Sequence, residues 1–318
     1  MKKGISAYGL GATLYMPATR HDIVDTIVTG KIVGLRSLVI CLEDAVTEQD
    51  LAAAMENLKG MLVALSKEKQ CHSLIGWPLI FIRPRNEKIG QQLVDEYDLS
   101  AVDGFVLPKF TLASLADWSA VLANTHLHWM PTLETEDVFD VNAMQELVAA
   151  LETHECRDKI IALRIGGNDL MNCVSLRRSR EFTLYDGPMG YVIKMLVAVF
   201  GPKGFALTAP VCEHIDDHRL LEKELALDVA HGLVGKTAIH PNQIGIIQKA
   251  LMVSSLDHED ALRINNSSKA VFKAGGAMCE PATHRRWAQS ILDRVHYFGV
   301  AQAPSPAAAS PSMQAQHG

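Results

Sequence analysis

Short apolar runs recur along the chain, and each ends at a glycine, a proline or a charged residue. Most of the segments between them are long enough for a helix, as at 50–65 and 112–122. Eight strands alternating with helices predict an α/β fold of the (β/α)₈ barrel type. An open doubly wound sheet is the alternative, but no run is followed by the Gly-x-Gly-x-x-Gly turn of dinucleotide-binding folds. The predicted strands are 11–17, 37–43, 78–83, 104–109, 127–134, 160–166, 205–210 and 236–241.

The stretch at 160–170 reads IIALRIGGNDL and predicts a strand that is buried on both faces. It breaks at two glycines, and Asp169 follows just beyond the end of the strand. The preceding strand, LHWMPTLE, closes on Glu134 in a similar way. Hard cations such as Mg²⁺ are usually held by one or two carboxylates together with substrate oxygens and water. The two acids are therefore candidate metal ligands.

The longest connection follows the sixth predicted strand. Its first half shows no regular spacing of apolar residues and carries Arg177, Arg178 and Arg180. We therefore interpret it as an active-site loop. Its second half, 189–200, predicts a buried helix.

Beyond the eighth strand we predict helices at 242–255 and 284–298, separated by a glycine-rich break at 273–276. We expect one barrel domain at 1–300, in which 257–300 form a C-terminal helical segment. The remaining residues, 301–318, lack an apolar face and are predicted to be disordered.

Composition narrows the functional classes. Hydrophobic residues make up 48% and charged residues 21% of the 318 residues, and the net charge of −6 offers no basic patch for nucleic acid. Six scattered cysteines without a C-x-x-C pair indicate reduced thiols rather than a zinc site or a disulfide framework. No segment has the roughly 18 uninterrupted apolar residues of a membrane span. Two glycines interrupt the apolar N-terminal run, so we expect no signal peptide and a cytoplasmic location.

In a barrel of this kind, catalytic groups lie at the C-terminal ends of the strands. Taken alone, each strand-end residue has an ordinary explanation, such as a helix N-cap for an acid. Taken together, they form an acidic cluster ringed by cations on one face of the barrel. The candidate residues are Glu43, Asp44, Arg83, Arg85, Lys109, Glu134, Asp169, Thr208 and His240.

Several motifs occur in the order and spacing of a known family: LYMPATR, VICLEDAV, FIRPRN, FVLPKF, a Glu134-Thr135 pair, GGNDL, GKTAIHPNQI and GAMCEP. They resemble the citrate lyase β-subunit-like branch of the HpcH/HpaI aldolase superfamily, over about 11–292. The resemblance implies a Mg²⁺-dependent (β/α)₈ carbon–carbon lyase acting on citryl-, malyl- or citramalyl-type acyl thioesters. It also implies a homotrimer or a multiple of one.

The same resemblance assigns roles to particular residues. Glu134 and Asp169 correspond to the ligands of Mg²⁺, for which Mn²⁺ can substitute. Arg83 corresponds to the arginine that steadies the enolate, because a fixed cation should face the charge that develops when an oxoacid leaves. Substrate contacts are expected from Arg83, Glu134 and Gly167.

Four further residues receive catalytic roles from the resemblance. Glu43 and Asp44 correspond to acids near the metal-bound water, which either orient ligands or transfer a proton. Lys109 corresponds to a strand-four lysine with an electrostatic role. Glu280, in GAMCEP, stands on a segment that can lie over a neighbouring subunit's site.

The chain departs from the family pattern at several places, including the unusual arginine-bearing loop after Asp169, and resembles a divergent subgroup of carbon–carbon bond lyases. Asn168 replaces a usual glutamate, the seventh strand reads LTAP where an acid is common, and Arg85 follows closely on FIRP. Two other functions are therefore considered: hydrolysis of the same thioesters, with Glu280 helping to activate water, and non-catalytic binding or assembly. Retention of Glu134, Asp169 and Arg83 together favours an enzyme.

Overall fold

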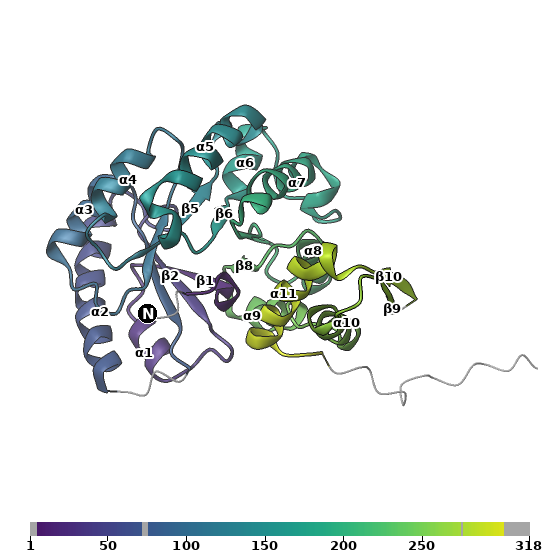
Figure 1. Ribbon diagram of the computed structural model, residues 1–318. Helices are drawn as coiled ribbons and strands as arrows, with labels where there is room; N and C mark the ends of the chain where they lie inside the picture. Colours follow the sequence, from purple (N-terminus) through teal and green to yellow (C-terminus); the bar gives the residue numbers. More distant parts are fainter. Residues whose placement is uncertain (1–4, 72–75, 275, 302–318) are drawn as a thin grey trace, which may run out of the picture. The chain divides into compact units, whose positions relative to one another are not determined.

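The computed structural model describes residues 5–71, 76–274 and 276–301. The chain divides into two compact units, Met1–Leu251 and Met252–Gly318, which are described separately (Figure 1). A single domain extending to residue 300 stays a prediction. Beyond Ala301, the tail predicted to be disordered lies outside the described residues.

The first unit is built on eight parallel strands in the order β7-β6-β5-β4-β3-β2-β1-β8. The two ends of this sheet also meet, since Ala209, just after β7, pairs in parallel with Lys236 of β8. The predicted (β/α)₈ barrel is thereby confirmed. The strands are β1 (Gly11–Pro17), β2 (Ser37–Cys41), β3 (Leu79–Arg83), β4 (Gly104–Leu107), β5 (His128–Leu133), β6 (Leu163–Ile165), β7 (Leu207–Thr208) and β8 (Gly235–Ala238).

Helices connect the strands and turn their apolar faces towards the barrel, as Leu58, Leu62 and Leu65 do on α2. Figure 1 shows α2, α3 and α4 on the outside of the strands. None of the helices in the described residues combines the length and apolar character needed to cross a membrane. The helices of this unit are α1 (Ile23–Val28), α2 (Leu51–Cys71), α3 (Glu87–Glu96), α4 (Leu115–Leu122), α5 (Val141–Thr153), α6 (Gly167–Cys173), α7 (Pro188–Phe200), α8 (His218–Ala230) and α9 (Pro241–Ala250).

Single 3₁₀ turns complete the connections. Two of them flank α7, and the rest precede β1, α5 and β6. They are η1 (Ala7–Gly9), η2 (Glu136–Phe139), η3 (Glu155–Lys159), η4 (Leu184–Asp186) and η5 (Gly201–Lys203).

The sixth and seventh strands are shorter than predicted. Ile160 forms only an isolated bridge with Trp129, and continuous pairing is confined to Leu163–Ile165 in β6 and Leu207–Thr208 in β7. An apolar run marks burial, whereas the length of a strand depends on which backbone groups find partners. The strand therefore ends where the chain turns at Gly166 into α6.

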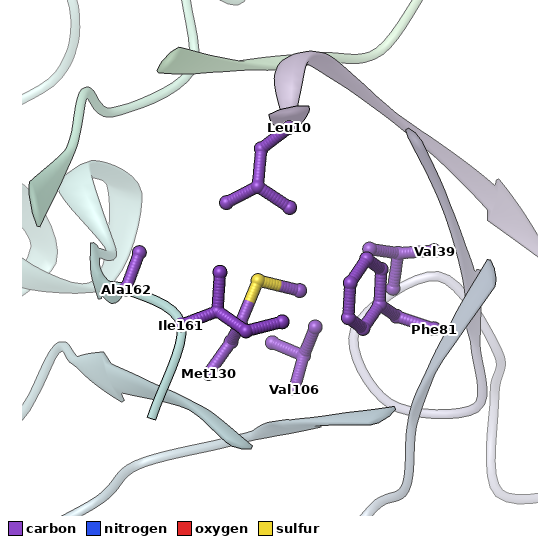
Figure 2. Packing of buried hydrophobic residues seen from close by; sticks show 7 residues of the cluster. All are labelled: Leu10, Val39, Phe81, Val106, Met130, Ile161 and Ala162. Carbon is purple, nitrogen blue, oxygen red and sulfur yellow. The ribbon is translucent and has the colours of Figure 1, made fainter. Parts of the chain in front are cut away.

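Apolar side chains fill the part of the barrel interior that lies away from the C-terminal ends of the strands (Figure 2). Because residues two apart on a strand share a face, the next inward positions above this core are Cys41, Arg83, Thr132 and Arg164. The apolar core thus supports a polar layer nearer the C-terminal ends of the strands. The core residues are Leu10, Val39, Phe81, Val106, Met130, Ile161 and Ala162.

Within its described residues, 252–274 and 276–301, the second unit contains two helices and a hairpin. Its apolar core joins residues of both helices to Val253, which also pairs in parallel with Val300. The predicted helix at 242–255 ends earlier, because Ser254 caps a new helix by accepting a hydrogen bond from the Asp257 backbone. The elements are α10 (Ser255–Asn266), β9 (Phe272–Ala274), β10 (Ala277–Cys279) and α11 (Pro281–Phe298).

Candidate active site

Arg83, the last residue of β3, lies at the centre of a cluster of acids. Its Nη2 is 2.7 Å from Glu43 Oε2 and 2.8 Å from Glu134 Oε1, while its Nη1 is 3.1 Å from Asp44 Oδ2. The side chains of Arg83, Glu43 and Glu134 are buried, and that of Asp44 is half-exposed. The structure therefore brings together residues at the C-terminal ends of three different strands.

Lys109, just after β4, closes the other side of the cluster. Its backbone N–H donates a hydrogen bond to Glu134 Oε1 at 2.7 Å. Its Nζ lies 2.8 Å from Glu43 Oε1 and 3.9 Å from Asp169 Oδ1. The residue has φ 46°, an uncommon conformation for a side chain other than glycine, which aims the N–H at Glu134. Backbone strain at a residue joining three acids marks this turn as a functional candidate.

The two glycines before Asp169 permit close packing around Glu134. A Cβ atom on Gly166 would lie 2.3 Å from Glu134 Oε2, and one on Gly167 would lie 2.7 Å from Pro210 Cβ. Gly167 begins α6, and Asp169 lies in its first turn with about a third of its side chain exposed. The GGND sequence thus places Asp169 beside Glu134 without a side chain intervening.

Replacing Gly166 by alanine should displace Glu134 and lower the free energy of unfolding by about 1–3 kcal/mol, the usual effect of overpacking. Chemical denaturation measures the change, and titration with Mg²⁺ should show weaker binding. The matched control is Gly245→Ala, within α9, where a Cβ would meet nothing within 4 Å. That variant should keep or slightly raise stability, since alanine favours helix. Equal stability of the two variants would contradict the close approach of Glu134.

The acids of the cluster differ in protonation. Burial raises the pKa of Glu134 to about 7, although Arg83 and the Lys109 N–H oppose the rise. Burial and a hydrogen bond with Glu43 raise the pKa of Asp44 to about 6. Burial also acts to raise the pKa of Glu43, but Arg83, Asp44 and Lys109 outweigh it and hold that pKa below its usual value. Carboxyl groups that titrate near neutrality beside fixed cations are typical of catalytic sites.

The cluster borders a cavity of about 240 Å³ inside the barrel mouth. This volume is below the roughly 300–1,000 Å³ of pockets that enclose drug-sized ligands, so it suits a small molecule. A larger cavity, about 370 Å³, lies beside α6 and α7 but is lined by none of the acids that contact Arg83. The charged residues lining the smaller cavity are Asp44, Arg83, Glu134, Arg164 and Asp169.

The donor set fits a hard divalent cation. Glu134 and Asp169 present carboxylate oxygens on the wall of the same cavity. Among the described residues, no group of three or more His, Cys, Asp or Glu side chains is arranged to hold a metal alone. Mg²⁺ commonly binds through one or two carboxylates and completes its shell with water and substrate oxygens. Two carboxylates on one cavity wall therefore fit the ligand preference of Mg²⁺.

Three other residues predicted for the site, Arg85, His240 and Glu280, have different contacts or positions. Arg85 donates a hydrogen bond to the Val46 carbonyl at 2.6 Å and pairs with Glu48, so it fastens the loop after β2. His240 caps α9 by accepting a hydrogen bond from the Asn242 backbone. Glu280 lies at the start of α11 in the second unit, and its role at the barrel site stays a prediction.

Arg178, in the loop after α6, belongs to a second buried ionic cluster that the sequence pattern did not reveal. Arg178 pairs with Glu224 of α8, and Lys236 of β8 lies 2.7 Å from Glu224 Oε1 and 2.9 Å from Asp228 Oδ2. The Tyr185 hydroxyl donates to Asp228 Oδ1 at 2.7 Å. Arg178 therefore anchors the loop to the barrel wall, whereas Arg177 is exposed near Glu213.

Arg164 lines the candidate site but was not among the residues predicted from the sequence. It lies in β6, is buried and lines the cavity. Its signal was present in the sequence, because an arginine interrupts an otherwise apolar strand.

Comparisons with known proteins agree with this fold. The solved structures similar to this chain include CitE from Mycobacterium tuberculosis in complex with magnesium, acetoacetate and coenzyme A, at 20% identity, with 90% of this chain and 98% of that chain covered and a TM-score of 0.65. The citrate lyase β subunit from M. tuberculosis complexed with oxaloacetate and magnesium is 21% identical over 77% of this chain and 99% of that chain, with a TM-score of 0.56. RipC from Yersinia pestis is 19% identical over 77% of this chain and 96% of that chain, also with a TM-score of 0.56.

A comparison with curated proteins found no match. The family model described as C–C bond lyase of the TIM-barrel fold matches residues 4–300, nearly the whole chain. This match confirms the family suggested by the sequence motifs. The chain belongs to the carbon–carbon bond lyases of the TIM-barrel fold.

Proposed function

We propose that the protein is a Mg²⁺-dependent lyase that cleaves a 3-hydroxyacyl thioester into an oxoacid and an acyl thioester, or catalyses the reverse condensation. The observation that carries the proposal is the contact of Arg83 with Glu43, Asp44 and Glu134 beside a small cavity. The similar structures support the substrate class, since those proteins were solved with magnesium and with acetoacetate, oxaloacetate or coenzyme A.

Cleavage requires a proton to leave the 3-hydroxyl group while the bond between C2 and C3 breaks. The hydroxyl carbon becomes the carbonyl of the oxoacid, and the electron pair of the broken bond forms the thioester enolate. A proton then adds at C2 to give the acyl thioester. The protein must therefore supply a base, a cation for the developing charge and a proton donor.

We assign proton transfer to Asp44 and charge stabilisation to Arg83. Asp44 is half-exposed and has a pKa of about 6, so it is mostly ionised at neutral pH and can accept and return a proton. The guanidinium of Arg83 is fixed by three carboxylates and needs little reorganisation as the enolate forms. Lys109 helps to keep Glu43 ionised and thereby helps to hold Arg83 in place.

Glu134 and Asp169 would hold the divalent cation, and Gly167 lies beside them in the same cavity. When bound, Mg²⁺ supplies Lewis-acid polarisation of the oxygen that becomes the oxoacid carbonyl. Mn²⁺ has similar ligand preferences and is proposed as a substitute.

The family resemblance further leads us to propose a cytoplasmic homotrimer or a multiple of one. In such an assembly Glu280 would act at the site of a neighbouring subunit. The carrier of the acyl group is proposed to be coenzyme A or a carrier protein.

The function is tested by incubating the purified protein and Mg²⁺ with citryl-, malyl- and citramalyl-coenzyme A and measuring oxoacid and free thiol together. A lyase should release oxoacid while the thioester stays intact, so free thiol should not increase. Thiol release without oxoacid would instead identify a thioester hydrolase. No Mg²⁺ or Mn²⁺ binding at millimolar concentration would reject the proposed metal dependence.

A further inference from the structure

Arg164 is a buried cation without an acidic partner. Its side chain projects from β6 into the barrel, and 2% of the residue is exposed. Nη2 donates to Thr237 Oγ1 at 2.5 Å, Nη1 lies 3.9 Å from the Met130 sulfur, and the guanidinium is 5.3 Å from the centre of the Tyr15 ring. No acidic side chain among the described residues forms an ion pair with Arg164.

This isolation distinguishes Arg164 from the other buried arginines of the described residues. Arg83 contacts three carboxylates, and Arg178 pairs with Glu224. Burying a charge without a counter-charge costs free energy, so buried guanidinium groups are normally paired. Arginine has five N–H donors, and the protein engages only two of them at Arg164, one through a weak sulfur contact.

Two neighbouring hydroxyl groups are also left without partners. Thr132 of β5 and Thr208 of β7 are aligned with Arg164 in the register of the sheet. The Oγ1 atoms of both threonines are buried and form no hydrogen bond. Because aligned residues on neighbouring strands share a face, the two threonines flank Arg164 on the inner face of the barrel. Unsatisfied buried donors on both sides of an unpaired cation indicate a site built for an anion.

We propose that Arg164, with Thr132 and Thr208, binds a second carboxylate of the substrate, so that the oxoacid half is a short dicarboxylate. This inference rests on the lyase function proposed above. A planar guanidinium binds a carboxylate through two parallel hydrogen bonds, and hydroxyl groups can donate to its remaining lone pairs. The anion therefore matches the donors that the protein leaves free.

The depth of the site agrees with two carboxylates at opposite ends of one small molecule. Arg164 of β6 is aligned with Thr132 of β5. Thr132 lies two residues before Glu134 in the chain. At about 3.3 Å per residue, this places the Cα atom of Arg164 roughly 7 Å deeper in the barrel than that of Glu134. Arg164, Thr132, Glu134 and Asp169 all line the cavity of about 240 Å³. One carboxylate can thus lie near Glu134 and Asp169 while the other reaches Arg164.

Malate and lactate test the proposal, because they are stable hydroxy acids that differ by one carboxylate group. Calorimetric titration in the presence of Mg²⁺ should show that the parent protein binds malate at least about tenfold more tightly, as expected for charge-assisted hydrogen bonds. Arg164→Met should abolish this preference and leave lactate binding within about twofold of the parent. Arg164→Lys should retain part of the preference, since it keeps the charge but loses the planar fork.

Thr208→Val provides an independent variant. It removes a hydroxyl without a partner and keeps the shape of the side chain, so folding should be unaffected. We expect malate binding to weaken about threefold, the lower end for loss of one hydrogen bond, while lactate binding is unchanged. If Arg164→Met does not fold, this variant decides the matter, and unchanged malate affinity would overturn the proposal.

Other outcomes are equally decisive. Equal binding of malate and lactate by the parent protein, or binding of neither, overturns the second carboxylate site. Persistence of the malate preference in folded Arg164→Met does so as well. A parent protein that binds Mg²⁺ but shows no malate preference contradicts this inference alone, whereas absence of Mg²⁺ binding contradicts the proposed function.

Discussion

Replacing Asp169 by asparagine should remove most of the affinity for Mg²⁺ and, with it, turnover of the thioester. Asparagine keeps the size of the side chain but lacks the charge that a hard cation prefers. Loss of groups that merely orient metal ligands weakens binding about 10–100-fold, so loss of a ligand should reach at least the upper end of this range. Calorimetric titration of parent and variant with Mg²⁺ measures the difference.

The stability of metal-free Asp169→Asn should stay level or rise. The negative charge of Asp169 contributes to the raised pKa of Glu134, and removing it relieves repulsion between the two acids. Asp217→Asn is the matched control, because Asp217 caps α8 by accepting a hydrogen bond from the Leu220 backbone. Asparagine caps about as well, so this control should bind Mg²⁺ like the parent. Unchanged Mg²⁺ affinity in Asp169→Asn would falsify the metal assignment.

Replacing Arg83 by methionine should lower the free energy of unfolding by about 3–5 kcal/mol, the usual effect of removing one partner from a buried ionic cluster. The variant leaves Glu43 and Glu134 buried without the cation that contacts both. Urea denaturation in the presence of a chelator measures the loss. The control is Arg20→Met, which breaks a partly exposed pair with Asp22 and should change stability by less than about 1 kcal/mol.

The deficit of Arg83→Met should shrink as the pH falls from 8 to 5. Arg83 lowers the pKa of both Glu43 and Glu134, so its removal raises both. A carboxyl group with a raised pKa in the folded state binds more protons than it does when unfolded, and stability then falls as the pH rises. Protonation at low pH relieves the penalty of the unpaired acids. A loss below about 1 kcal/mol at pH 8 would show that other groups stabilise them.

Much of the barrel was predictable because its strands are marked by local pattern. The strand predicted at 11–17 coincides with β1, and the strand-end acids gather because parallel strands all end at the same rim. The lengths of β6 and β7 were not predictable, since they depend on pairing with strands that are distant in sequence. An apolar run records burial, but hydrogen-bond partners decide where a strand ends.

The least predictable parts of the site were the buried charges. Arg164 stands inside a run predicted to be a strand buried on both faces, and its alignment with Thr132 and Thr208 follows only from the register of three strands. Arg178 was interpreted as part of an active-site loop, yet its partner Glu224 lies on α8, far along the chain. A sequence shows that a charge is present, while the fold decides what faces it.

The ionic cluster on the outer wall of the barrel has an evolutionary consequence. Glu224 pairs with both Arg178 and Lys236, and Lys236 also pairs with Asp228. Two cations and two carboxylates balance there, so losing any one of them leaves a buried charge without a partner. Replacing a cation and a carboxylate together restores neutrality, and the effects of such paired changes are not additive. These four positions should therefore covary among related sequences, exchanging as a set between a fully ionic and a fully apolar version of the wall.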